Sequence, residues 1–262
     1  MYKEEIKNVA LSAKMKSDYL NDSIIKFFLL AMMSGFFIIV GIALAFTTAS
    51  IVNVDGTYYG KIAIGLTFPI ALGLLYFAGG ELFTGNCFIF TIGLLEKTVN
   101  LKNTIKILIV GYLGNLTGSI VLALLYVKSK APIGLADQYI EKVAESKLII
   151  PPDELFLRAI LCNFIVCMSI WLCYKMKEET AKLFMLLWCV FAFSTPGFEH
   201  SIANMGIFAI SLMLPHAETL TISAAAQNLA WVTFGNIVGG SIFSAFPYWY
   251  ISKGKKQKQI SQ

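Results

Sequence analysis

Charged residues are scarce in this chain of 262 residues. Only 14% of the residues are charged while 57% are hydrophobic, whereas a soluble domain carries about a quarter charged residues. So few polar side chains cannot cover the surface of a soluble domain, which excludes an ordinary soluble enzyme, a disordered protein and a nucleic-acid-binding protein. The composition instead predicts an all-α membrane protein that is surrounded by the lipid bilayer and binds no nucleic acid.

Histidines and paired cysteines are scarce as well. The chain has two histidines and five cysteines, and every cysteine lies in an apolar stretch without a C-x-x-C pair. A structural zinc site needs a tight cluster of cysteine and histidine ligands. We therefore expect no metal centre, no cofactor and no disulfide framework, and we interpret the cysteines as small apolar residues.

Long apolar segments are what the sequence has in abundance. A helix needs about 20 apolar residues to cross a hydrocarbon core about 30 Å thick, and four of six such segments have roughly this length. The second and fifth segments have about 35 and 32 residues, with polar and helix-breaking residues at their centres. We therefore expect these two transmembrane helices to be broken. The six segments are 27–48, 61–95, 107–126, 155–174, 183–214 and 228–250.

The distribution of lysine predicts the orientation in the membrane. Fifteen of the twenty lysines precede the first segment, follow the last, or lie in the second-to-third and fourth-to-fifth connections. Cytoplasmic loops carry such an excess, so we expect both termini in the cytoplasm. We divide the chain into an amphipathic helix on the inner membrane surface at 1–22, a six-span domain at 23–252 and a basic tail at 253–262. The predicted apolar face of the amphipathic helix consists of Ile6, Val9, Ala10, Ala13 and Tyr19.

The two halves of the chain repeat one pattern. In the second and fifth segments a glutamate precedes an asparagine by five residues, and a Gly-Asn pair follows in the third and sixth segments. Because each half has three spans, an odd number, the halves must be inverted relative to each other, which predicts an inverted 3+3 repeat. Breaks at matching positions of such a repeat indicate a substrate path near the middle of the bilayer. The paired residues are Glu81 and Glu199, Asn86 and Asn204, and Asn115 and Asn236.

The two breaks, predicted at 82–86 and 195–201, should face each other across this path. Half-helices that begin near Thr84 and His200 would direct their N–H groups and positive dipole ends inward, which favours an anion. Thr84 and Ser201 add hydroxyl donors. His200 is the only histidine in a span. Its imidazole can bind an entering anion, lend it a proton, or remain neutral in a structural hydrogen bond to Thr84.

Charged residues near the breaks have alternative interpretations. Glu81 and Glu199 can brace the breaks by accepting hydrogen bonds, or they can couple transport to protons. Bracing is favoured because a carboxylate in the path would repel anions. Lys147, before the fourth span, can attract anions by steering or can extend its amine to the membrane surface. For Arg158 we expect only such a surface or bracing role.

Other residues beside the breaks are candidates for lining the path. The amides of Asn115, Asn163 and Asn236 can hold substrate or join helices. Large apolar side chains at the breaks can form constrictions that exclude hydrated ions. The apolar candidates are Phe68, Leu72, Leu82, Phe83 and Phe193.

Four motifs together resemble the formate/nitrite transporter family. They are GGELFTGN at 79–86, LCNFIVC at 161–167, GFEHSIANM at 197–205 and GNIVGG at 235–240. The resemblance implies an aquaporin-like six-helix protomer in a bacterial inner membrane, assembled as a homopentamer with one anion pore in each protomer. It also implies a role for each matching residue. These are His200 and Thr84 at the pore centre, Phe68 and Leu72 in an inner slit, Leu82 and Phe193 in a central constriction, Lys147 at the outer approach, and Asn163 and Asn236 facing the pore.

The substrate is predicted from finer detail in these motifs. The family includes proteins for formate, nitrite, lactate and hydrosulfide, and its formate channels tend to have D-L-F-T-S where this chain has E-L-F-T-G-N. The motifs look most like the bacterial hydrosulfide branch. We therefore expect a passive channel for small monovalent weak-acid anions, hydrosulfide first, with formate, nitrite or proton-coupled anion transport as alternatives. An intramembrane enzyme is not expected, because the spans contain one histidine and no paired aspartates.

Overall fold

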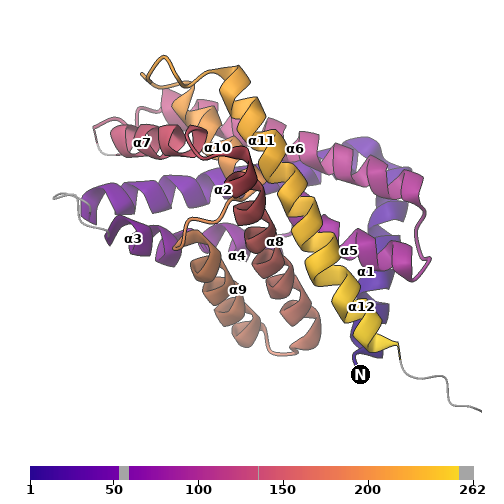
Figure 1. The fold of residues 1–262 in the computed structure, drawn as a ribbon. Helices are drawn as coiled ribbons and strands as arrows, with labels where there is room; N and C mark the ends of the chain where they lie inside the picture. Colours follow the sequence, from indigo (N-terminus) through magenta and orange to yellow (C-terminus); the bar gives the residue numbers. More distant parts are fainter. Residues whose placement is uncertain (53–58, 135, 254–262) are drawn as a thin grey trace, which may run out of the picture.

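The computed structural model describes residues 1–52, 59–134 and 136–253, and every regular element in these ranges is a helix (Figure 1). The bounds are α1 (Lys3–Asp22), α2 (Ile24–Val52), α3 (Tyr59–Thr67), α4 (Ile70–Phe77), α5 (Phe83–Leu95), α6 (Leu101–Lys128), α7 (Asp137–Leu148), α8 (Pro152–Lys175), α9 (Glu179–Ser194), α10 (Ser201–Ser211), α11 (Ile222–Val238), η1 (Gly239–Ala245) and α12 (Phe246–Ser252). The element η1 is a π-helix. The predicted basic tail lies, apart from Lys253, outside the described residues.

Six membrane spans follow from this order of helices. The first, third and fourth are α2, α6 and α8, and the sixth joins α11, η1 and α12. The second span consists of α3, α4 and α5, and the fifth of α9 and α10. Five helical stretches among the described residues are long and apolar enough to cross a membrane, by length and composition. The all-α fold, the inverted 3+3 arrangement and the two broken spans are therefore confirmed. The five cysteines are free and buried.

The two breaks, at 78–82 and 195–200, have the same local design. In each, a glycine two residues before the glutamate has a positive φ, which is 87° at Gly79 and 82° at Gly197. Other residues adopt this conformation only at a cost, because their Cβ collides with the backbone. Pro69 adds a further interruption between α3 and α4, since proline cannot donate the hydrogen bond that would continue a helix.

The first break begins four residues earlier than its predicted position, 82–86. The prediction is wrong because Gly85 lies inside α5. A Cβ on Gly85 would lie 2.5 Å from the Cδ1 atom of Ile170, so this glycine permits close packing of α5 on α8 and does not end a helix. The second break, predicted at 195–201, ends one residue earlier because Ser201 is the first residue of α10.

Two helices outside the six spans, α1 and α7, lie on opposite sides of the molecule (Figure 1). Each precedes the first span of its half. The helix α1 packs against α5, and its buried face includes Ile6, Val9, Ala10 and Ala13 as predicted. Tyr19 is not part of this face, because its side chain is 41% exposed. The sequence does not predict α7, because its 12 residues are mostly polar and resemble a loop in a hydropathy pattern.

Candidate functional site

The centre of the site is a hydrogen bond between the two broken spans. His200 Nε2 lies 2.9 Å from Thr84 Oγ1, and both side chains are buried. His200 is also the N-cap of α10, because its Nδ1 accepts a hydrogen bond from the backbone N–H of Ala203 at 3.1 Å. An accepting Nδ1 carries no proton, so the neutral imidazole has its proton on Nε2 and donates it to Thr84. The Thr84 O–H is then left to donate to a ligand.

Glu199 braces the second break through side chains. Its Oε1 accepts a hydrogen bond from Lys147 Nζ at 2.8 Å, and its Oε2 accepts one from Asn204 Nδ2 at 2.6 Å. The side chain of Lys147 is only 13% exposed. Lys147 is therefore an ion-paired residue inside the protein, which replaces the membrane-surface position considered for it. Its pairing also compensates the carboxylate charge that would otherwise repel an anion.

Glu81 has the same arrangement with Lys16 at the first break. Lys16 Nζ donates to Glu81 Oε2 at 2.8 Å and to Asn86 Oδ1 at 3.1 Å, and Asn86 Nδ2 donates to Glu81 Oε2 at 2.9 Å. Sequence reasoning misses Lys16 as a site residue. The inverted repeat contains the signal that finds it, because Lys16 precedes the first span of its half as Lys147 precedes the first span of the other.

Asn115 and Asn236 hold the two breaks in the same way. Each Oδ1 accepts from the first N–H of the half-helix that follows the break, Phe83 at 3.0 Å and Ser201 at 2.9 Å. Each Nδ2 donates to the carbonyl of the break glutamate and to a carbonyl of the first span of the same half. These bonds satisfy backbone groups that have no helical partner and no bulk water.

Asn163 connects the two halves at the same depth. Its Nδ2 donates to the carbonyl of Thr84 at 3.2 Å and to that of Asn236 at 2.6 Å. The side chains of Asn163 and Asn236 are fully buried, and their amides are engaged with the backbone. The resemblance implies that these two asparagines face the pore. Their geometry instead favours the interpretation that they join helices.

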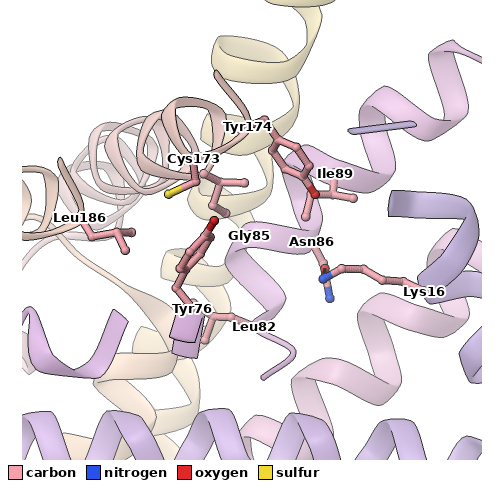
Figure 2. Close-up of a pocket in the computed structure, with 10 residues that line it drawn as sticks. Lys16, Tyr76, Leu82, Gly85, Asn86, Ile89, Cys173, Tyr174 and Leu186 are labelled. Carbon is pink, nitrogen blue, oxygen red and sulfur yellow. Dashed lines mark hydrogen bonds between the residues drawn. The ribbon is translucent and has the colours of Figure 1, made fainter. Parts of the chain in front are cut away.

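Two cavities lie on either side of this centre. The smaller, of about 100 Å³, is lined by Lys147 and His200 among others. The larger, of about 260 Å³, is lined by Lys16, Leu82 and Tyr174 among others (Figure 2). Lys147 precedes α8, whereas Tyr174 is its second-last residue. A helix of 24 residues is about 36 Å long, so the two cavities lie near opposite ends of α8.

The apolar residues predicted to form constrictions are buried in one hydrophobic cluster, but they are grouped differently from the expectation. Phe68 meets Phe193 edge-on with ring centroids 6.5 Å apart, and Phe193 stacks on the His200 ring at 6.0 Å. Both phenylalanines line the smaller cavity. Leu82 lines the larger cavity. Phe68 was expected to pair with Leu72, but it pairs with Phe193. Leu82 was expected to pair with Phe193, but it lies on the other side of the His200–Thr84 centre.

Comparison with known proteins decides the family of this chain. The sequence model of the formate/nitrite transporter family matches residues 3–250. This chain belongs to the formate/nitrite transporter family. Its sequence is 35% identical over 251 residues to the nitrite transporter NirC of Salmonella typhimurium, covering 95% of this chain and 92% of that protein. It is also 35% identical over 257 residues to the uncharacterized transporter YwcJ of Bacillus subtilis, covering 96% and 99%.

Two solved structures of the formate/nitrite transporter family have the same fold. An FNT family ion channel has a TM-score of 0.90 and 35% identity, covering 95% of this chain and 98% of that chain. A pentameric formate channel with formate bound has a TM-score of 0.76 and 27% identity, covering 88% and 98%. These relatives are transporters and channels, so this chain is a multi-pass membrane protein of the anion-channel class and not an enzyme. The family predicted from the four motifs is confirmed.

Proposed function

We propose that this protein conducts small monovalent weak-acid anions passively along a path between the smaller and the larger cavity. The observation that carries the proposal is the buried His200–Thr84 pair between two cavities that each hold one lysine. Phe193 on one side of the pair and Leu82 on the other are apolar, and such constrictions exclude hydrated ions.

The electrostatics of the proposed path offset the cost of an anion in the membrane. Insertion scales give roughly 2.5–3.5 kcal/mol for a charged side chain at mid-bilayer. Lys16 and Lys147 neutralise Glu81 and Glu199, so the two ends of the path do not repel an anion, and the N-terminal ends of α5 and α10 lower the cost at the centre. At the centre the Thr84 O–H is free to donate. The Ser201 hydroxyl is buried and has no hydrogen-bond partner among the described residues, so it is a second donor for the anion.

The substrate proposed first from the motifs is hydrosulfide. Nitrite is a second candidate, because a relative that is 35% identical over 95% of this chain is a nitrite transporter. Formate is a third, because a channel of the same fold has been solved with formate bound. All three are small monovalent anions of weak acids, so the same path suits each of them.

Assembly and orientation are part of the proposal. The relative solved as a pentameric formate channel supports a homopentamer, and the bacterial transporters to which this chain is similar support a position in the bacterial inner membrane. The lysine excess supports cytoplasmic termini. The helix α1 and the larger cavity then lie on the cytoplasmic side of a channel domain formed by 23–252, with the basic tail at 253–262 on the same side.

Reconstitution into proteoliposomes tests the proposed function. Flux is measured for hydrosulfide, nitrite, formate and chloride, each with and without a proton gradient. A passive channel should conduct at least one of the three weak-acid anions better than chloride, with flux proportional to the concentration gradient. Flux that saturates and stops when the proton gradient is removed would contradict a passive channel and support proton-coupled transport.

A further inference from the structure

Two tyrosine hydroxyls and one ammonium group are directed into the larger cavity (Figure 2). Tyr76 belongs to α4, Tyr174 to α8 and Lys16 to α1. The rest of the lining is mostly apolar, and includes Leu82 and Leu186. The two hydroxyls have no role in the path through the His200–Thr84 centre, and their convergence from separate helices requires a separate explanation.

Lys182 of α9 lies over the ring of Tyr76. Its ammonium group lies 5.6 Å from the centroid of the Tyr76 ring and donates a hydrogen bond to Glu179 Oε1 at 2.7 Å. The Tyr76 hydroxyl can donate its O–H to an acceptor in the cavity.

Tyr174 of α8 and Lys16 of α1 line the cavity together. The Tyr174 side chain lines the same cavity as Tyr76, and its hydroxyl can donate an O–H there. Lys16 donates two hydrogen bonds, to Glu81 and Asn86, and an ammonium group has three N–H bonds. Among the described residues these two are its hydrogen-bond acceptors, so one N–H remains for a ligand in the cavity.

We propose that Tyr76 and Tyr174, with Lys16, form a subsite that selects anions with two oxygen atoms, such as formate and nitrite, over hydrosulfide. The remaining N–H of Lys16 can bind any anion and does not discriminate. The hydroxyls do discriminate, because oxygen accepts hydrogen bonds strongly and sulfur weakly. An anion with two oxygens can also engage two donors from different helices, whereas hydrosulfide has a single heavy atom. This inference rests on the proposed function and changes its order of substrates, because the subsite places formate and nitrite before the hydrosulfide that the motifs place first.

The test measures formate and hydrosulfide flux at one pH in proteoliposomes that contain the full chain. The variants are Tyr76→Phe, Tyr174→Phe and the double substitution. Tyr112→Phe is the matched control, because the Tyr112 hydroxyl is hydrogen-bonded to Thr233 at 2.9 Å and lines a different, apolar cavity. Each single variant should lower the formate-to-hydrosulfide flux ratio about 3- to 10-fold, the effect of one lost hydrogen bond. The double variant should lower it further, and the control should not change it.

The outcomes separate this inference from the proposed function. Flux with an unchanged ratio in the double variant overturns the selective subsite and leaves the anion channel standing. Failure of the unmodified chain to conduct any anion overturns both. A second measurement needs no variant: formate should inhibit hydrosulfide flux at lower concentration from the side of α1 than from the side of α7. Equal inhibition from the two sides overturns the subsite.

Discussion

His200 has two hydrogen-bonding roles that one substitution can separate. Its Nδ1 caps α10 by accepting from Ala203, and its Nε2 donates to Thr84. A second proton could enter the ring only at Nδ1, where it would face the N–H of Ala203. The hydrogen bonds therefore favour the neutral imidazole. This supports a donor role that acts through Thr84 over the proton-lending role.

We expect His200→Asn to keep the cap, because asparagine is a preferred N-cap residue, and to keep part of the flux. If the imidazole acts only while neutral, the ratio of variant flux to unmodified flux should stay constant between about pH 5 and pH 8, the range in which histidine ordinarily titrates. The measurement is anion flux in proteoliposomes at several pH values. A ratio that changes across this range would show that His200 gives a proton to the anion.

His200→Phe provides the comparison for this prediction. It removes the cap as well as the donor, so we expect a loss of about 0.5–2 kcal/mol in stability and a fall of at least roughly tenfold in flux. Equal flux in the two variants would contradict a role for the donor.

The sequence identifies some site residues and not others for a physical reason. A histidine in an apolar run is conspicuous, because an ionisable group in a membrane is costly without a function. Lys16 is one of several lysines on a polar helix, and no local pattern shows that it pairs with Glu81, 65 residues away. Long-range ion pairs become visible only when the helices are placed in space.

At the scale of the element, the breaks depend on asparagine side chains. Asn236→Leu would leave the N–H of Ser201 and the carbonyls of Ala159 and Glu199 without these partners. Each unsatisfied buried group costs about 1–3 kcal/mol. We expect a clear loss of thermal stability in detergent and little flux, and Asn115→Leu should behave alike because its bonds are equivalent.

The control for these variants is Asn8→Leu, because Asn8 is exposed on α1. Thermal unfolding followed by intrinsic fluorescence measures the difference. A stability loss in Asn236→Leu no larger than in the control would show that water or a shift of the backbone replaces the amide.

The existence of the breaks is predictable from sequence, but their bounds are not. Glycine and polar residues inside an apolar run indicate an interruption, and both interruptions are present. The glycines of the motif at 79–86, however, have different structural roles. Gly79 provides a positive φ, whereas Gly85 allows α5 to approach Ile170. Only the packing of neighbouring helices distinguishes the two.

At the scale of the whole molecule, the two halves of the inverted repeat hold their breaks with the same residue types but differ in the residue that follows the glutamate. Glu81 and Glu199 occupy equivalent places, each with a lysine and with an asparagine five residues later. The residue directly after the glutamate is Leu82 in one half and His200 in the other. The same brace therefore presents an apolar side chain to one side of the centre and a hydrogen-bonding ring to the other.

All parts of this path, from Lys16 through His200 to Lys147, belong to one chain. If the proposed homopentamer forms, each protomer should therefore conduct independently. We expect pentamers assembled from mixtures of unmodified and His200→Phe chains to show flux that falls in direct proportion to the fraction of the variant. The measurement is flux per pentamer in proteoliposomes, with the mixing ratio determined by mass spectrometry. A fall steeper than proportional would mean that the protomers act together, as they would if anions crossed along the fivefold axis.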